Sequence, residues 1–176
     1  MLLKFSRGSA LSALVCLSVL AALAESRAQG LVTVQRLSAA LANELVREAV
    51  AACAAKNHPV TAIVVDPGGV RQAMLRGDGA PIHTVDSAYY KAYSAASLTL
   101  ARKEEGTRAV AERISKNPPS NVPQTQLPNI IYTQGGLTII AGGNPVGGIG
   151  VGGAPGNNID EECGRAALAK IRDRLK

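Results

Sequence analysis

The hydrophobic positions of two segments recur about every four residues, which is the spacing of a helix with one buried face. One segment runs from Ser38 to about Lys56, and the other starts at Asn157 or Asn158 and continues to the C-terminus. The stripes consist of Leu41, Leu45, Ala49 and Cys53 in the first segment and Ile159, Cys163, Ala167, Ile171 and Leu175 in the second. We therefore expect a helix at each end of the main domain, the first capped by Ser38.

Runs of β-branched residues alternate with turn signals and predict two hairpins. The expected strands cover residues 60–65, 70–76, 136–141 and 146–151. Asp66-Pro67-Gly68-Gly69 separates the first two strands, and Gly142-Gly143-Asn144-Pro145 separates the last two. Residues 84–98 and 107–116 lie between the hairpins and are expected to be helical. Helices combined with hairpins predict an α+β domain with an antiparallel sheet.

The first 28 residues have the order of a secretory signal peptide. Lys4 and Arg7 precede an apolar run over residues 10–24, and Ser26-Arg27-Ala28 places small residues three positions and one position before a cut. We expect cleavage after Ala28, a single domain over residues 29–176, and a periplasmic or secreted location. A retained membrane anchor is the alternative, but the run is shorter than the roughly 20 apolar residues of a spanning helix. No membrane partner is therefore expected after cleavage.

The charge of the remaining chain gives little support to nucleic-acid binding. The whole sequence has 19 basic and 13 acidic residues, of which 16 and 12 lie beyond residue 28. The basic residues are scattered, apart from a cluster in the expected C-terminal helix, where they suit the helix dipole. A nucleic-acid binder has a basic face or stripe instead.

Two cysteines remain after cleavage, Cys53 and Cys163. Each lies on the apolar stripe of a terminal helix, so the two sulfurs can meet if these helices pack side by side. An oxidising compartment permits a disulfide between them. Two buried free thiols that act as small hydrophobic groups are the alternative.

The segment Gly148-Ile149-Gly150-Val151-Gly152-Gly153 matches the GxGxxG pattern of dinucleotide-binding proteins. That fingerprint requires a strand, a helix and a further parallel strand, whereas this chain ends with its last helix. We therefore interpret these glycines as part of a hairpin strand that a neighbouring backbone approaches closely.

Several motifs together resemble the GlcG/HbpS family of small haem-binding-type proteins. They are Val64-Val65-Asp66-Pro67-Gly68-Gly69, Arg76-Gly77-Asp78-Gly79-Ala80, Lys91-Ala92-Tyr93-Ser94-Ala95, Gly142-Gly143-Asn144-Pro145 and the glycine-rich run 148–153. The resemblance extends from about Val34 to Leu175 and implies a five-stranded antiparallel sheet flanked by helices, a profilin-like fold. It also implies a homo-oligomer and haem or a related tetrapyrrole as ligand. The chain departs from the family at Pro67 and Gly77, which both lie in turns.

A haem requires an axial ligand to iron, apolar walls, and cations or backbone donors for its propionates. His58 and His83 are the two imidazoles, and Met74 is the one thioether beyond Met1. We select His83 as the candidate iron ligand, because Asp86, Tyr90 and Tyr93 follow it at helical offsets near one face. The alternative is a solvated loop histidine.

Two cations are candidates for the propionates, Arg76 and Lys91. Each has an equally simple structural role: Arg76 can pair with Asp78 on the surface, and Lys91 can pack its stem against the sheet. The sequence alone leaves both alternatives open.

Three functions are compatible with this sequence. The first is an exported haem-binding protein that sequesters or delivers its ligand. The second is an enzyme that degrades haem oxidatively, and the third is an oligomeric accessory or sensory partner of another exported protein. Hydrolytic catalysis has no support, because no Ser, His and Asp set or Cys and His set occurs at a recognisable spacing.

Overall fold

The computed structural model describes residues 30–116 and 127–176. The expected signal peptide over residues 1–28 lies outside the described residues. Contacts divide the chain into two units, Met1–Thr33 and Val34–Lys176, and the second contains every helix and strand named below. None of the described helices has the length and apolar character needed to cross a bilayer.

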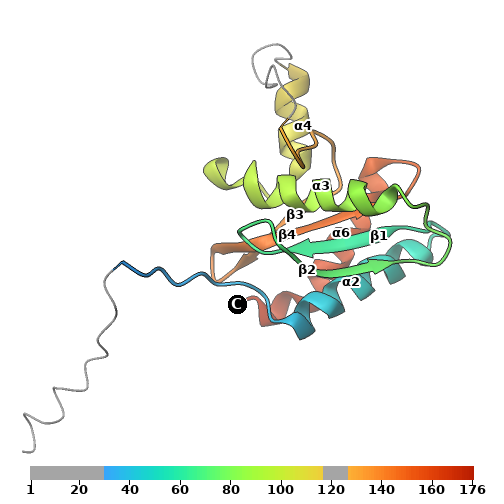
Figure 1. The fold of residues 1–176 in the computed structure, drawn as a ribbon. Helices are drawn as coiled ribbons and strands as arrows, with labels where there is room; N and C mark the ends of the chain where they lie inside the picture. Colours follow the sequence, from blue (N-terminus) through green and yellow to red (C-terminus); the bar gives the residue numbers. More distant parts are fainter. Residues whose placement is uncertain (1–29, 117–126) are drawn as a thin grey trace, which may run out of the picture. The chain divides into compact units, whose positions relative to one another are not determined.

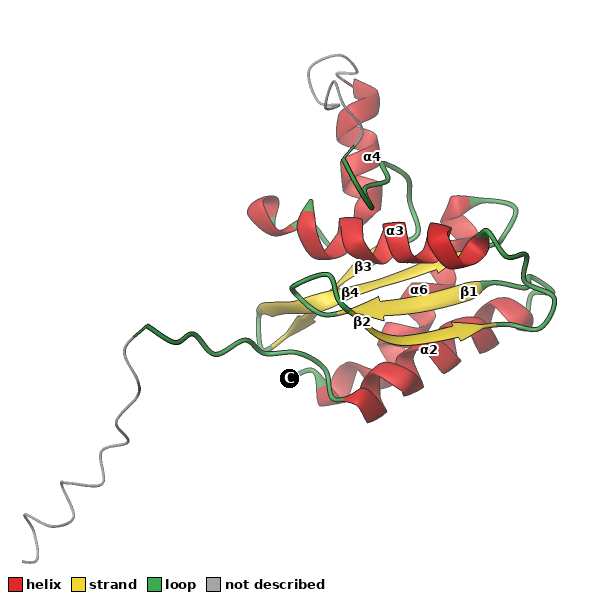
Figure 2. Cartoon of the chain, in the orientation of Figure 1, coloured by secondary structure: helices red, strands yellow, loops and turns green. Residues whose placement is uncertain are grey.

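The sheet consists of two antiparallel hairpins, as the sequence predicts (Figure 2). Its strands are β1 (Thr61–Val65), β2 (Arg71–Arg76), β3 (Gly136–Ala141) and β4 (Asn144–Gly152). Their order is β2-β1-β4-β3, so the two hairpins meet where β1 pairs with β4. Gly142 and Gly143 form the second hairpin turn with φ of 54° and 79°. Two positive φ angles are the requirement of a tight two-residue turn, and glycine meets it without strain.

The expectation of five strands is wrong, because the described residues form a sheet of four strands. Glu105 and Gly106 meet the outer edge of β3 through an isolated bridge from Gly106 to Leu137 and a hydrogen bond from the Thr138 N–H to the Glu105 carbonyl. A helix begins directly afterwards, at Thr107. The chain therefore leaves this edge before a strand can extend along it.

Helices cover both faces of the sheet (Figure 1). On one face lie α2 (Ala39–Ala54) and α6 (Asn157–Ile171), and on the other lies α3 (Thr84–Ser97), followed by η2 (Leu100–Arg102) and α4 (Thr107–Lys116). A short 3₁₀ turn, η3 (Arg172–Arg174), follows α6. Ser38 caps α2 as expected, since its Oγ accepts a hydrogen bond from the Leu41 N–H at 3.3 Å.

The two faces have separate cores, because successive side chains of a strand point in opposite directions. Strand β1 illustrates this: Ala62 and Val64 pack with α2 and α6, whereas Ile63 and Val65 pack with α3. The larger core holds most of the buried Leu, Ile and Val. The core under α3 is built mainly from alanines and one tyrosine: Ala88, Tyr89, Ala92 and Ala96.

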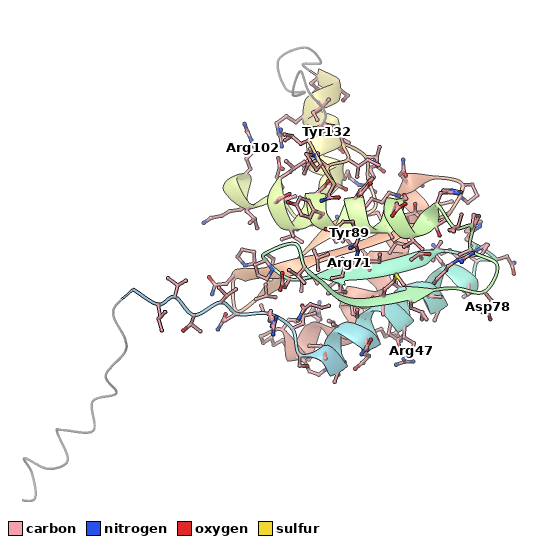
Figure 3. All side chains as sticks on the ribbon, viewed as in Figure 1. Arg47, Arg71, Asp78, Tyr89, Arg102 and Tyr132 are labelled. Carbon is pink, nitrogen blue, oxygen red and sulfur yellow. A yellow bond between two sulfur atoms is a disulfide. The ribbon has the colours of Figure 1, made fainter. Side chains whose placement is uncertain are left out.

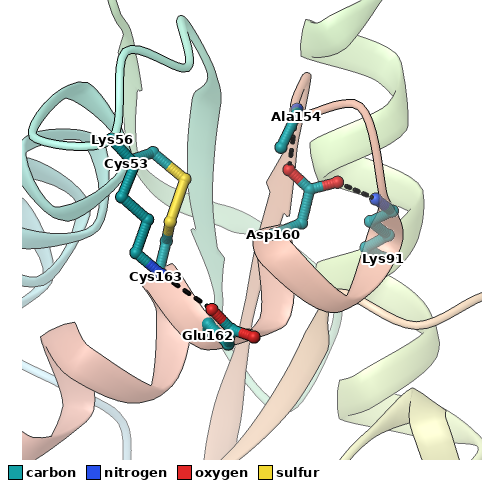
Figure 4. The surroundings of a disulfide bond; sticks show 7 residues. All are labelled: Cys53, Lys56, Lys91, Ala154, Asp160, Glu162 and Cys163. Atoms are coloured by element: carbon teal, nitrogen blue, oxygen red, sulfur yellow. Dashed lines mark hydrogen bonds and ion pairs between the residues drawn. A yellow bond between two sulfur atoms is a disulfide. The ribbon is translucent and has the colours of Figure 1, made fainter.

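A disulfide joins the two helices of the larger core (Figure 4). Cys53 of α2 and Cys163 of α6 are both buried, with an S–S distance of 2.05 Å and a Cα–Cα distance of 5.5 Å. The two cysteines are thus bonded to each other, which is the first of the two alternatives that the sequence leaves open. Beside it, the Lys56 Nζ lies 2.7 Å from the Glu162 Oε2, and this hydrogen bond lowers the pKa of the Glu162 carboxyl.

The GxGxxG match lies in β4 and the residue after it, and its glycines at 148, 150 and 152 face α3. A Cβ atom added to Gly150 would overlap the Ala88 carbonyl oxygen, and one added to Gly148 would overlap the Ala92 carbonyl oxygen. Glycine is therefore needed for α3 to lie this close to the sheet, in agreement with the close approach inferred from the sequence.

Candidate functional site

Helix α3 carries most of the candidate chemistry, and its position determines what is exposed. Its small residues pack on β1 and β4, where the glycines of β4 let it settle close to the sheet. The Thr84 Oγ1 also lies 2.7 Å from the Thr61 Oγ1, which ties the start of α3 to the start of β1. The helix covers β1 and β4 but not the edge strand β2, so β2 keeps an open surface on this side.

Three tyrosines of α3 cluster with an arginine of β2. Figure 3 labels Tyr89 and Arg71, the pair at the centre of this cluster. The Tyr89 ring lies 6.0 Å from the Tyr90 ring and 5.9 Å from the Tyr93 ring, centroid to centroid. The Arg71 guanidinium carbon lies 3.4 Å from the centroid of the Tyr89 ring, a cation–π contact that holds the guanidinium in place. The Tyr89 hydroxyl donates to the Gly69 carbonyl at 3.3 Å.

A register shift in the first hairpin decides which side chains of β2 face α3. The shift lies between Val64 and Val65, so that Val64 pairs with Ala73 but Val65 pairs with Arg71. Directly opposite residues of an antiparallel pair point to the same face. The residues of β2 on the face of α3 are therefore Arg71, Met74 and Arg76, opposite Val65, Ile63 and Thr61.

The three side chains of this row offer a thioether and two guanidinium groups to a ligand. Met74 is 52% exposed. The Arg76 Nε donates to the Ala80 carbonyl at 2.7 Å, and within the described residues neither Arg71 nor Arg76 has a carboxylate partner. We call Arg71, Met74, Arg76 and Tyr89 the α3–β2 surface.

His83 immediately precedes α3, in its N-cap position. It is exposed, and no hydrogen bond to its ring occurs among residues 30–116 and 127–176, so Asp86 does not orient it in this structure. Tyr90 and Tyr93 are half-buried and lie seven and ten residues further along the helix. At 1.5 Å per residue, Tyr90 lies about 10 Å along the helix axis from His83.

Lys91 has a different environment from the other candidates. Its side chain is 2% exposed, and its Nζ donates to the Asp160 Oδ2 at 2.7 Å (Figure 4). The Nζ also donates to the Asn157 Oδ1 at 2.9 Å. The Asp160 Oδ1 accepts the Ala154 N–H at 3.0 Å. Lys91 thus joins α3 to the start of α6, and its ammonium does not reach the surface on which a propionate would lie.

A cleft of about 650 Å³ lies elsewhere, between the start of α2 and the C-terminal residues. Its basic side chains are already paired, Arg174 with Glu44 and Lys176 with Asp173. The hydrogen bond from Arg174 lowers the pKa of the Glu44 carboxyl. This cleft therefore offers a ligand less unsatisfied charge than the α3–β2 surface does.

Residues in and beside α3 and β2 carry donor types that a haem can use. Within the described residues, no three His, Cys, Asp or Glu side chains converge as a protein metal site would require. A haem iron needs only one or two axial ligands from the protein, together with cations for the propionates. An exposed imidazole, an exposed thioether and two arginines without carboxylate partners in the described residues are donors of these types.

The sequence was compared with family models and with curated proteins. A model described as "Haem degrading protein HbpS-like" matches residues 37–169. The chain belongs to the HbpS-like family. Among curated protein sequences, no significant match to this HbpS-like chain was found.

Solved structures share the fold of this HbpS-like domain. A double mutant of HbpS from Streptomyces reticuli is 32% identical, with a TM-score of 0.71 over 83% of this chain and 94% of the other. The Klebsiella pneumoniae protein ORFY is 26% identical, with a TM-score of 0.71 over 82% and 96% of the two chains. A PduOC–heme complex, at 22% identity and a TM-score of 0.66 over 77% and 95%, shares the fold.

Two members of the α3–β2 surface were not singled out from the sequence. The sequence does not indicate Arg71, because strict alternation along β2 places it with Ala73 on the face away from α3. The register shift is what brings Arg71 to Tyr89. The sequence does not indicate Tyr89 either, because Tyr90 and Tyr93 fit the helical spacing from His83 better. The adjacency of three tyrosines in one helix was the available signal.

Proposed function

We propose that this protein is an exported haem-binding protein that sequesters or delivers a tetrapyrrole. The match to the HbpS-like family over residues 37–169 carries the proposal. The donor groups around α3 support it, since an imidazole and cations are among the groups that a haem needs from a protein. The heme complex of PduOC, which has the same fold, supports it as well.

In this proposal His83 is the iron ligand, and Tyr90 and Tyr93 form part of the wall for the macrocycle. Arg76 supplies charge for a propionate. When bound, the iron would supply a redox-active centre with a site for a small ligand. Lys91 contributes indirectly, because its bonds to Asp160 and Asn157 hold α3 in place.

The first test is a titration of the purified protein with haemin, followed through the Soret band. We expect saturable binding with a shifted Soret band, and a weaker or altered spectrum for His83→Ala because the variant lacks the imidazole. His58→Ala is the matched control: His58 is half-buried in the turn before β1, and its loss is expected to leave the spectrum unchanged. Equal spectra for both variants and the parent would remove His83 from the site.

Export is part of the proposal and has its own test. The order of basic, apolar and small residues before Gln29 supports it. The disulfide between Cys53 and Cys163 supports it as well, because such bonds persist in oxidising compartments. We expect amino-terminal sequencing of exported protein to begin at or within a few residues of Gln29. An intact Met1 on that material would contradict the proposal.

Oxidative degradation of haem is the second candidate function. The description of the family as haem-degrading favours it. The two functions are distinguished by adding a reductant to the haem complex in air. A binding protein keeps its Soret band after correction for free haem, whereas a degrading enzyme loses it and releases an open-chain tetrapyrrole that mass spectrometry detects.

We also propose that the protein assembles as a homo-oligomer, as the family resemblance implies. The exposed Met74 and Ile82, at 52% and 79%, are apolar groups that a second copy would cover. Light scattering on the exported protein measures the subunit number. A monomer at high concentration would contradict this part of the proposal and leave haem binding to be judged by the titration.

A further inference from the structure

The outer edge of β3 is covered near its start and open at its end. The Thr138 N–H donates to the Glu105 carbonyl, and the chain passes into α4 at Thr107. Alternate residues of a strand direct their N–H and C=O groups toward the same edge, so the Ile140 backbone points outward as the Thr138 backbone does. In the described part of the chain, no backbone group outside the sheet meets the Ile140 N–H, and Ile140 is 44% exposed. The end of β3 can therefore accept another strand.

Two hollows lie along this edge, one on each face of the sheet. The hollow beside α6 has a volume of about 520 Å³, and the hollow beside η2 has a volume of about 380 Å³. Thr138 and Ile140 line both hollows. The other large apolar side chains are Leu137, Leu168 and Leu175 in the first and Leu100 and Pro145 in the second. We call the open edge of β3 and these two hollows the edge groove.

The form of the edge groove suits an extended segment. Side chains of a strand alternate between its two faces, so a strand added to β3 would place its side chains alternately in the two hollows. Its main chain would bond to the Ile140 backbone. Main-chain bonds at an open edge, combined with pockets for alternate side chains, are a general mode of peptide recognition.

The chain carries a segment suited to this groove directly before α2. Residues 31–36, which we call the arm, read Leu-Val-Thr-Val-Gln-Arg and contain the β-branched residues that strands favour, without proline or glycine. Leu31, Val32 and Val34 are 80%, 87% and 62% exposed. Ten large apolar residues are exposed in the described part of the chain, of which three belong to the arm and two to the edge groove. Joining the arm to a groove would therefore cover half of them.

The position of the arm favours the groove of a second copy. Its root is held at the β1–β2 hairpin, where the Arg36 guanidinium lies 3.6 Å from the Asp66 carboxylate. The Gln72 side chain also donates to the Leu37 carbonyl at 3.0 Å. Strands β2 and β3 form opposite edges of the sheet, so the groove of the same copy lies on the far edge from this root. An arm that begins near Gln29 has a free end that can enter a neighbouring groove, and six extended residues span about 20 Å.

We propose that the arm of one copy pairs with the open edge of β3 in a second copy. This inference rests on the export and homo-oligomer parts of the proposed function, because cleavage frees the arm and a second copy supplies the groove. Val32 and Val34 lie on one face of the added strand and enter the hollow beside α6. Leu31 and Thr33 lie on its other face and enter the hollow beside η2. The arm thus supplies a contact between copies.

The first test measures the subunit number of the exported protein by light scattering. Val32→Asp places a charge in an apolar hollow of the neighbour, and Val32 is 87% exposed in the single chain, so the fold is expected to remain. We expect the parent to form an oligomer and this variant to lose it at the same concentration. Val70→Asp is the matched control, because Val70 is 63% exposed but lies between β1 and β2, and it is expected to keep the subunit number of the parent. An arm variant that assembles like the parent overturns the inference and leaves the homo-oligomer standing, whereas a monomeric parent overturns both.

A cross-link between copies identifies the two surfaces directly. Cys53 and Cys163 are bonded to each other, so Val32→Cys and Leu168→Cys each add one free thiol to the processed chain. We expect co-expression of these two variants to give a disulfide between residue 32 of one chain and residue 168 of the other, which mass spectrometry of the unreduced protein locates. Val70→Cys in place of Val32→Cys is expected to give none. The absence of a bond beyond that control overturns the inference.

Discussion

Replacing Asp160 with asparagine is expected to lower the free energy of unfolding of this domain by about 3–5 kcal/mol. The Asp160 carboxylate and the Lys91 ammonium are each 2% exposed and lie 2.7 Å apart. The variant keeps the shape of the side chain but removes its charge, so the Lys91 charge remains buried without compensation. Removing one partner of a buried ion pair costs more free energy than the intact pair contributes relative to apolar side chains in the same place. Equilibrium unfolding in urea measures it.

Glu162→Gln is the matched control for Asp160→Asn, because both residues lie in α6 and pair with a lysine. The Glu162 and Lys56 side chains are 54% and 47% exposed, and exposed ion pairs contribute little to stability because water screens them. We expect the control to change the free energy of unfolding far less than Asp160→Asn does. Equal losses for the two variants would contradict the structural role assigned to Lys91.

Reduction of the Cys53–Cys163 disulfide is expected to lower the free energy of unfolding by about 2–5 kcal/mol. The bond spans a sequence separation of 110 residues, and closing so long a loop removes much of the freedom of the unfolded chain. The chain-entropy model places the contribution at about 4–5 kcal/mol for such a loop. Urea unfolding with and without reductant measures it.

The double variant Cys53→Ala/Cys163→Ala separates loss of the cross-link from other effects of the reductant. Its free energy of unfolding is expected to be the same with and without reductant, whereas that of the parent falls. Thiol counting on denatured, unreduced protein is the direct check. No free thiols, with no dimer, agrees with the bond, and two free thiols per chain would refute it.

Much of the fold follows from the spacing of apolar residues and from turn chemistry. Strand β3 and helix α4 have the bounds that the sequence predicts, because turns or polar residues mark their ends. Strand β4 begins earlier than expected, at Asn144. The composition suggested a four-residue turn, but two glycines with positive φ complete it, and Asn144 and Pro145 join the strand. The fifth strand was expected from the family resemblance alone.

The site was less predictable, because its contacts depend on residues far apart in the sequence. The partner of Lys91 is 69 residues away, and no local pattern indicates that the lysine is buried. The face of Arg71 depends on one register shift in β2, which reverses the alternation that the sequence suggests. By contrast, Tyr90 and Tyr93 were identifiable, since helical spacing alone places them near one side of α3.

Native mass spectrometry of the protein purified from the exported fraction of its own host tests haem binding most directly. It weighs the folded protein with whatever ligand it carries, without adding haemin. The account predicts a species heavier than the processed chain by the mass of haem, with the same ligand released on denaturation. Protein that carries no tetrapyrrole, and that also fails to take up haemin when it is offered, would contradict the account.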